Sequence, residues 1–176
     1  MTSPDPVKVV ALDELASFLD AHPEERGGLV LANGLFDLLH VGHVRYLEAA
    51  RAAGRRLVVA LNSDASARRL KGAGRPVVPL AERLEIVAAL ACVDWATWFE
   101  EDTVERVLRR IRPEAHAKGT DYTVETVPER AVAAELGVRT LIVGDPKRHA
   151  SSDLIRRAEA GPKKAASGSG RREPGG

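Results

Sequence analysis

The chain has 176 residues, of which 44% are hydrophobic but only 4% aromatic, and its formal net charge is +1. Such a length suits one domain, because domains commonly hold about 100 to 200 residues. A net charge this small gives no overall field that would attract nucleic acid or an acidic membrane, so neither is expected as a partner. The lone Cys92 excludes an internal disulfide, and the sequence has no CxxC or Cys/His zinc spacing.

Targeting signals are not expected. Residues 1–6 lack a basic stretch followed by an apolar run, so no signal peptide is predicted. No apolar segment approaches the roughly 20 residues that a membrane-spanning helix needs. We therefore expect a cytoplasmic protein.

The first predicted elements form a β-α-β unit. A leading helix within residues 11–21 precedes two short apolar runs, 29–32 and 57–61, which are branched and bounded by Gly or Asn. Such runs are typical of strands buried on both faces. Between them, 44–53 has a helical apolar pattern, and Gly54 is predicted as its C-cap. Strand, helix and strand together predict a right-handed crossover.

The alternation of helix and strand then continues. The predicted elements are helix 80–90, strand 93–99, helix 103–111, strand 115–118, helix 128–136 ended by Gly137, and strand 140–143. This order predicts an α/β fold with a Rossmann-like, doubly wound, parallel five-stranded sheet in a single domain over 1–160. Residues 161–176, rich in Gly, Ser, Pro, Lys and Arg, are predicted to be a disordered tail. The long connections 71–79 and 119–127 are candidates for functional loops.

The most informative segment is 33–43, Asn-Gly-Leu-Phe-Asp-Leu-Leu-His-Val-Gly-His. It lies where the first predicted strand ends and the next helix begins, which is where open α/β sheets bind ligands. The amides of a helix start favour a phosphate, and Gly42 lets that phosphate approach the backbone. His40 and His43 are three residues apart, so they project to one side if the first helical turn includes both. Zinc binding by the two imidazoles is the less favoured alternative, because the sequence offers no third ligand nearby.

At these residues the sequence resembles the cytidylyltransferase-like nucleotidyltransferases, whose mark is His-x-Gly-His after a strand that ends in a Phe-Asp turn. The resemblance covers about residues 8 to 157 and is strongest to the heptose 1-phosphate adenylyltransferase branch. The supporting strings are Asn-Gly-Leu-Phe-Asp-Leu-Leu-His, Leu-Asn-Ser-Asp-Ala-Ser, Arg-Leu-Lys-Gly, Arg-Pro-Val, Phe-Glu-Glu-Asp-Thr and Lys-Gly-Thr-Asp-Tyr. Glycerol-phosphate cytidylyltransferases share the first motif but match the later strings less well.

The resemblance implies roles for individual residues. His40 and His43 would contact the NTP phosphates and stabilise the transition state, with Asp37 near the metal or the attacking group. Lys71 would reach phosphates from a flexible loop, and Arg83 would contact phosphate from the following helix. From the residues alone, Asp37 could instead be a turn residue, Lys71 part of a solvated loop, and Arg83 a partner in a surface salt bridge.

Further candidates would complete the binding site. Lys118, Gly119, Asp121 and Tyr122 would line the sugar or nucleotide side. Ser151 and Ser152 fall on the family's late Ser-Thr-Thr motif, although a plain helix cap explains them equally well. The remaining candidates for nucleotide or substrate binding are Asn33, Gly34, Leu35, Phe36, Gly42, Asn62 and Asp64. For Asn62 and Asp64 a turn and helix cap is favoured over ligand contact.

The resulting hypothesis is an enzyme, a nucleotidyltransferase that moves AMP from ATP to a sugar 1-phosphate and releases pyrophosphate. D-glycero-D-manno-heptose 1-phosphate is the expected acceptor, although Thr120 stands where many heptose enzymes have a second Gly. Mg²⁺ is expected as cofactor, held mainly by the NTP phosphates and not by a metal site of the protein. A homodimer is expected by analogy only. Two alternatives stay open: a CTP-dependent transferase acting on glycerol 3-phosphate or another alcohol phosphate, and a non-catalytic nucleotide-binding module.

Overall fold

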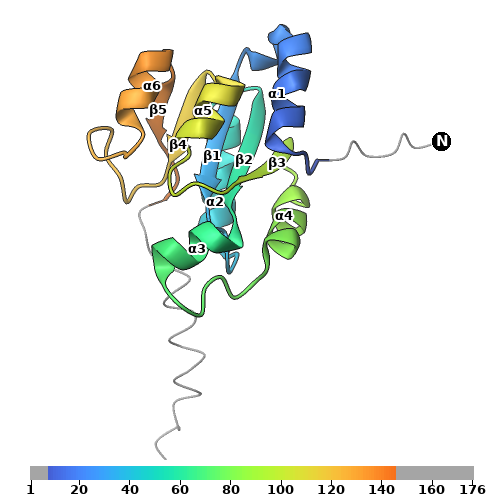
Figure 1. Cartoon of the computed structure of the whole chain (residues 1–176). Coiled ribbons are helices and arrows are strands. Elements are labelled where there is room, and N and C mark those ends of the chain that lie inside the picture. The colour runs from blue at the N-terminus through green and yellow to red at the C-terminus, as the bar shows by residue number, and fades with distance from the viewer. Residues whose placement is uncertain (1–7, 146–176) are drawn as a thin grey trace, which may run out of the picture.

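The structure is a computed structural model, and it describes residues 8–145 (Figure 1). Five strands form one parallel sheet in the order β3-β2-β1-β4-β5. The strands are β1 (Leu29–Gly34), β2 (Arg56–Asn62), β3 (Trp95–Phe99), β4 (Ala115–Lys118) and β5 (Arg139–Ile142). The predicted Rossmann-like, five-stranded parallel sheet is thus confirmed. The predicted tail at 161–176 and the candidates Ser151 and Ser152 lie outside the described residues.

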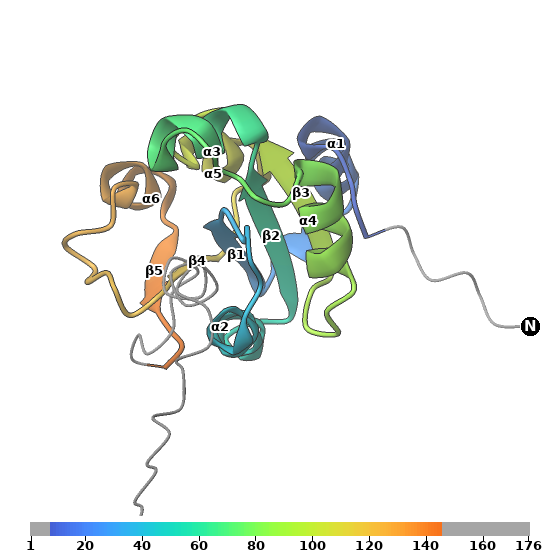
Figure 2. The same ribbon diagram turned by 90° about the horizontal axis from the view of Figure 1, so that it is seen from below.

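Helices cover both faces of the sheet, as Figure 2 shows from below. They are α1 (Leu12–Ala21), α2 (Val41–Ala52), α3 (Asp64–Lys71), α4 (Leu80–Ala88), α5 (Glu105–Ile111) and α6 (Arg130–Leu136), and a short 3₁₀ turn η1 (Pro23–Arg26) follows α1. Apolar residues of α1, α5 and α6 pack on one face, and those of α2 and α4 on the other. This two-sided cover is what the doubly wound prediction requires.

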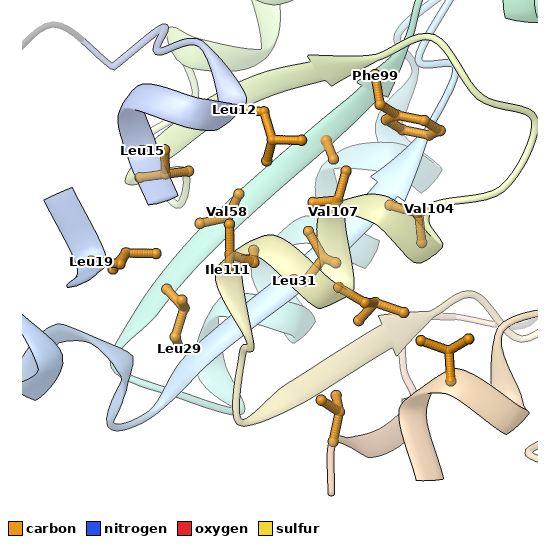
Figure 3. Packing of buried hydrophobic residues seen from close by; sticks show 14 of the residues in the cluster. Leu12, Leu15, Leu19, Leu29, Leu31, Val58, Phe99, Val104, Val107 and Ile111 are labelled. Atoms are coloured by element: carbon orange, nitrogen blue, oxygen red, sulfur yellow. The ribbon is translucent and has the colours of Figure 1, made fainter. Parts of the chain in front are cut away.

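The packing of the core explains why the sequences of the central strands are continuous apolar runs. In β1, Leu29 and Leu31 point into one apolar cluster while Val30 and Ala32 point into the other, because successive side chains of a strand alternate between faces. Leu12, Leu15 and Leu19 are spaced to form one stripe along α1 against the first cluster (Figure 3). Both faces of β1 are therefore buried.

Most element boundaries lie within two residues of the sequence-based expectation, and the larger differences are the start of α2 and the presence of α3. Helix α2 begins at Val41, three residues before the predicted start, because His40 takes the N-cap position. Helix α3 was not predicted, since its sequence Asp-Ala-Ser-Ala-Arg-Arg-Leu-Lys is mostly polar. Its cap is Ser63, whose hydroxyl accepts a hydrogen bond from the amide of Ser66 at 3.2 Å, and not Asn62 or Asp64. Lys71 is the last residue of this helix and so does not belong to the loop.

Gly54 was wrongly predicted as the C-cap of α2, a place that Ala53 occupies. A Cβ at Gly54 would collide with the carbonyl oxygen of Gly28 and lie 2.5 Å from Val30 Cγ2. The glycine is therefore needed because the chain after α2 passes close to the start of β1. Gly137, in contrast, ends α6 in the left-handed conformation with φ 70°, as predicted.

The strand order sets the place of a ligand site. From β1 the chain moves outward to β2 and β3, and it then returns to place β4 on the other side of β1. The connections that leave β1 and β4 therefore part in opposite directions. In open α/β sheets this switch point opens a crevice beyond the carboxyl ends of the two strands.

Removing buried side-chain volume from the α5 face of the core is expected to destabilise the fold. Ile111→Ala truncates a side chain that is 0% exposed and should lower the free energy of unfolding by about 2–5 kcal/mol. Ile86→Ala is the matched control, because Ile86 is 43% exposed, and it should stay within about 0.5 kcal/mol of the parent. Urea unfolding of both variants measures the difference, and equal stabilities would contradict the packing described here.

Candidate functional site

A cavity of about 970 Å³ lies at the carboxyl ends of β1 and β4. Its lining includes most of the candidates predicted from sequence: Asn33, Gly34, Leu35, Phe36, Asp37, His40, Gly42, His43, Asn62, Lys71, Lys118, Gly119, Asp121 and Tyr122. Asp64 and Arg83 do not line it. The fold thus brings together the motif after β1, the end of α3 and the segment after β4, which are far apart in the sequence.

The two motif histidines lie side by side at the start of α2. His40 is the N-cap, and its carbonyl accepts hydrogen bonds from the amides of His43 at 2.9 Å and Val44 at 3.3 Å. The two imidazole rings stack with their centroids 3.8 Å apart and an interplanar angle of 20°. Phe36 packs against His43 edge to face at 5.3 Å. The spacing prediction is therefore confirmed: both imidazoles project to one side, and both line the cavity.

The turn that carries the motif is strained. Phe36 has φ 49°, in the left-handed region that residues with a side chain rarely adopt. Its ring is buried, and a Cβ added at Gly34 would lie 3.2 Å from it. Holding a residue in this conformation costs about 1–2 kcal/mol. The strain turns the chain sharply from β1 toward α2, and strain of this kind gathers at functional sites.

The start of α2 adds backbone donors to the two imidazoles. The first amides of an α-helix, here those of Val41 and Gly42, have no partner within the helix. The helix dipole places partial positive charge at the same end. Amides, dipole and imidazoles together suit this end of the cavity to phosphate.

The carboxylate of Asp37 holds the loop 72–79 against the motif. Oδ1 accepts hydrogen bonds from the amides of Val77 at 2.7 Å and Val78 at 2.9 Å, and Oδ2 lies 2.9 Å from Nε of Arg75. Asp37 is almost fully buried. The sequence-based prediction placed this carboxylate near the metal or the attacking group. The structure instead engages both of its oxygens with the loop.

Arg83 is a correction to the predicted phosphate contact. Its side chain is fully buried, and its guanidinium donates to the carbonyls of Val78, Leu35 and Asn62 and pairs with Asp64 at 2.7 Å. These bonds tie together the ends of β1 and β2, the loop and the start of α3. Arg83 thus positions the wall of the cavity and does not reach into it.

Lys118 carries a charge that is compensated inside the protein. Its ammonium lies 3.1 Å from Oε2 of the buried Glu129, donates to Oδ1 of Asn33 at 3.1 Å, and sits 5.2 Å from the ring centroid of Tyr122. A charge removed from water needs such partners, because desolvation of an unpaired ion is costly. Lys118 therefore lines the cavity, as predicted, with its charge already neutralised by a carboxylate.

The orientation of the Asn33 side chain follows from Lys118 and His116. An ammonium can only donate, so the atom of Asn33 that faces Lys118 must be the oxygen. The same Oδ1 lies 2.9 Å from Nε2 of His116, which must then carry the proton on Nε2. The amide nitrogen of Asn33 consequently points away from β4 and is available as a donor to the cavity, which Asn33 lines.

Sequence reasoning missed several residues of the cavity wall. Tyr46, one turn after His43 on α2, is half-buried and donates its hydroxyl to the carbonyl of Ala117 at 2.7 Å, and desolvation raises the pKa of this phenol. Only its helical spacing from His43 could have indicated it. Glu129 gave no local signal, and Arg75 was indicated only through the candidate loop 71–79, because its pairing with Asp37 joins two separate segments. The other missed lining residues are Arg45, Leu70, Asp102, Thr103, Thr120, Pro128, Val143, Gly144 and Asp145.

Two further features bear on metal and membrane binding. Within residues 8–145, no group of three or more His, Cys, Asp and Glu side chains is arranged to hold a metal ion, so the zinc alternative gains no third ligand for His40 and His43. No helix in the same part of the chain has the length and apolar character to cross a membrane.

The fold and cavity define a class: a Rossmann-like α/β protein with a cavity at the switch point, lined by two stacked histidines at a helix start. The family model described as cytidylyltransferase-like matches residues 31–173. The chain therefore belongs to the cytidylyltransferase-like family of nucleotidyltransferases.

Similar proteins agree with this assignment. Over 154 residues the chain is 46% identical to the bifunctional protein HldE of Geotalea uraniireducens, covering 88% of this chain and 31% of that one. Over 137 residues it is 48% identical to the bifunctional protein HldE of Streptomyces coelicolor, covering 78% and 30%. The chain thus spans about a third of the length of these curated relatives.

Solved structures show the same fold. The lipopolysaccharide core biosynthesis protein from Thermoplasma volcanium superposes with a TM-score of 0.59 at 25% identity, over 69% of this chain and 99% of that one. Pantothenate synthetase from Thermus thermophilus superposes with a TM-score of 0.60 over 82% and 63%, and at 18% identity it speaks for the fold alone.

If Arg83 positions the cavity wall, its replacement should destabilise the protein even without ligand. Arg83→Gln leaves three carbonyls and Asp64 without their guanidinium partner and should lower the free energy of unfolding by about 3 kcal/mol or more. Chemical denaturation of the ligand-free protein measures this. A residue that acts only as a phosphate ligand would leave that free energy unchanged.

His116 should make the fold sensitive to mild acid. Burial, assisted by the nearby charge of Lys118, lowers the pKa of this imidazole from 6.5 to about 4. Between these values the unfolded chain binds more protons than the folded one, so stability should be complete above pH 6.5 and fall as the pH drops toward 4. The loss should reach up to about 3 kcal/mol, at about 1.4 kcal/mol per pKa unit.

Urea unfolding at several pH values checks this with two variants. His116→Gln keeps a donor for Asn33 but cannot titrate, so its stability should depend less on pH between 4 and 6.5. His22→Gln changes an exposed histidine on the outside of the protein and should keep the parental pH dependence. Equal slopes for the parent and His116→Gln would refute the assignment.

Proposed function

We propose that this protein transfers AMP from ATP to a sugar 1-phosphate, releasing pyrophosphate, with D-glycero-D-manno-heptose 1-phosphate as the acceptor. The observation that carries the proposal is the stacked His40–His43 pair at the start of α2, inside the large cavity at the switch point. The strings shared with heptose 1-phosphate adenylyltransferases favour this acceptor. The similar Thermoplasma volcanium structure is that of a lipopolysaccharide core biosynthesis protein, which also fits a sugar substrate.

The cavity is large enough for two substrates, and its lining includes both phosphate-binding and sugar-binding types of side chain. At about 970 Å³ it lies at the upper end of the usual range for small-molecule sites. The imidazoles and helix amides of the motif, and Lys71 from the end of α3, suit phosphates. Thr120, Asp121 and Tyr122 line the cavity from the segment after β4, and their hydroxyl, carboxylate and phenol groups suit the hydroxyls of a sugar or ribose.

The proposed reaction is one in-line displacement. An oxygen of the acceptor phosphate attacks the α-phosphorus of ATP, forming a P–O bond while the bond to the β-phosphate breaks and pyrophosphate leaves. The acceptor oxygen is already anionic, so no base has to remove a proton. Mg²⁺ enters as part of the nucleotide substrate and neutralises the leaving group. The protein contributes positioning and donors for the charge that builds on the α-phosphate.

The geometry supports a role for each of several residues in this proposal. His40, His43 and the first amides of α2 donate to the phosphate oxygens. Asn33, with its amide nitrogen turned to the cavity, supplies a neutral donor beside them. Lys71, exposed at the end of α3, adds positive charge at the cavity mouth.

The nucleotide and the acceptor are tested together by a substrate matrix. Four NTPs are combined with heptose 1-phosphate, other sugar 1-phosphates and glycerol 3-phosphate, and pyrophosphate release is measured. Turnover only with ATP and a sugar 1-phosphate supports the proposal. Turnover with CTP and an alcohol phosphate supports the alternative transferase, and nucleotide binding without any pyrophosphate release supports a non-catalytic module.

His43→Ala should remove a preorganised donor from the transition state. Loss of a comparable donor lowers kcat by about 10² to 10³. His22→Ala is the matched control, since His22 lies outside the cavity, and its turnover should stay near the parental value. Pyrophosphate release gives the rates, and circular dichroism checks that both variants are folded. Near-normal turnover of His43→Ala would overturn the catalytic role.

A further inference from the structure

We propose that Arg75 binds a phosphate group in the cavity through its two terminal nitrogens, and that Asp37 is the positioning residue that aims it. The inference deepens the proposed function and rests on it, because it assumes that phosphorylated substrates enter this cavity. The juxtaposition that carries it is the ion pair between Arg75 Nε and Asp37 Oδ2 at 2.9 Å, on the wall that also holds the two motif histidines.

The charges of the cavity single out two cations. Among the described residues, the lysines and arginines that line it are Arg45, Lys71, Arg75 and Lys118. Arg45 pairs with Asp145 at 2.9 Å, and Lys118 pairs with Glu129 at 3.1 Å. An ATP and a sugar phosphate together bring more negative charge than two imidazoles and one Mg²⁺ balance. Arg75 also has a carboxylate partner, Asp37, but it pairs through Nε and not through a terminal nitrogen as Arg45 does. Lys71 and the terminal nitrogens of Arg75 are therefore the donors left to contact a phosphate.

The mode of pairing leaves Arg75 able to bind a ligand. A guanidinium has five N–H donors, and Asp37 contacts only the Nε edge. Within residues 8–145 neither terminal nitrogen of Arg75 has a protein partner. Those two nitrogens form the planar fork that matches two oxygens of a phosphate.

Arg75 is also held in place before any ligand arrives. Its side chain is only 18% exposed, and the loop around it is fixed by the Val77 and Val78 amides on Oδ1 of the same Asp37 carboxylate. A side chain already ordered loses less entropy on binding. Lys71, in contrast, is an exposed side chain at a helix end.

The covalent chain links this device to the catalytic motif. Asp37 stands three residues before His40 in the turn from β1 to α2. Any movement of that turn shifts both the imidazoles and the anchor of Arg75, so the phosphate held by Arg75 keeps its place relative to the histidines. The bound group is the phosphate of the nucleotide or that of the acceptor, two sources of one chemistry.

The test measures direct binding by calorimetry, so that it does not depend on turnover. The probes are the magnesium complex of α,β-methylene-ATP, inorganic phosphate and heptose 1-phosphate, each titrated alone. Arg75→Gln should weaken the probe that Arg75 holds by about 10- to 100-fold, as expected for the loss of charged hydrogen bonds. Arg75→Lys should fall between the parent and Arg75→Gln, because it keeps the charge but loses the fork.

Asp37→Asn tests the positioning role. It should weaken the same probe, and the double variant with Arg75→Gln should lose less than the product of the two single effects, since both changes remove one function. A purely structural Asp37 would instead give independent effects. In steady state, the KM of the matching substrate should rise in both single variants. Arg139→Gln is the matched control, because it breaks the Arg139–Glu114 ion pair at the opposite end of the sheet and should leave all affinities unchanged.

The outcomes are distinct. A loss confined to the ATP analogue, or confined to inorganic phosphate and heptose 1-phosphate, supports the inference and identifies the source. Affinities of Arg75→Gln equal to those of Arg139→Gln for every probe would overturn it. If Asp37→Asn does not fold, Arg75→Gln decides alone. If the parent releases no pyrophosphate with any substrate pair but Arg75→Gln still weakens a probe, the proposed function fails and the phosphate site stands.

Discussion

The constraint on which the site depends is the reversal of strand order at β1. Parallel strands are joined by crossover connections, and these are right-handed. The chain runs from β1 to β2 and β3 on one side and then returns to β4 on the other side of β1. The connections that follow β1 and β4 therefore turn away from each other. The ends of β1 and β4 are thereby left uncovered. The Phe36 turn, the start of α2 and the segment after Lys118 all converge on that opening.

Charge compensation decides which polar residues serve the ligand. Arg83, Lys118 and Asp37 are all buried beside the cavity, and each has internal partners, because an ion that loses water without gaining a partner is strongly destabilised. The family resemblance implied a phosphate contact for Arg83 and a place on the sugar or nucleotide side for Lys118. In the structure, the buried Arg83 instead binds backbone carbonyls and Asp64. The charge of Lys118 is neutralised by Glu129.

The same network sets the polarity of a neutral group. The Asn33 oxygen accepts from both Lys118 and His116, so the opposite end of the amide is fixed as a donor. Glu129 holds Lys118 and comes from the segment before α6, so the orientation of one side chain on β1 depends on an element almost a hundred residues later. Preorganised dipoles of this kind are what an active site needs when charge develops during a reaction.

The sequence by itself determined the sheet, most of the helices and the central motif. Apolar runs of strand length, Gly137 and the three-residue spacing of His40 and His43 are local signals, and local physics suffices to interpret them. Helix α3 was not predicted because its polar sequence has little apolar pattern. Gly54 was wrongly predicted as a helix cap, because the residue that requires a glycine there, Gly28, is distant in the chain. Only the tertiary structure decided the partners of Asp37, Arg83 and Lys118. Their ion pairs join residues 38, 19 and 11 positions apart in different segments. Which segments lie side by side decides such pairs, and no spacing within a single segment encodes that.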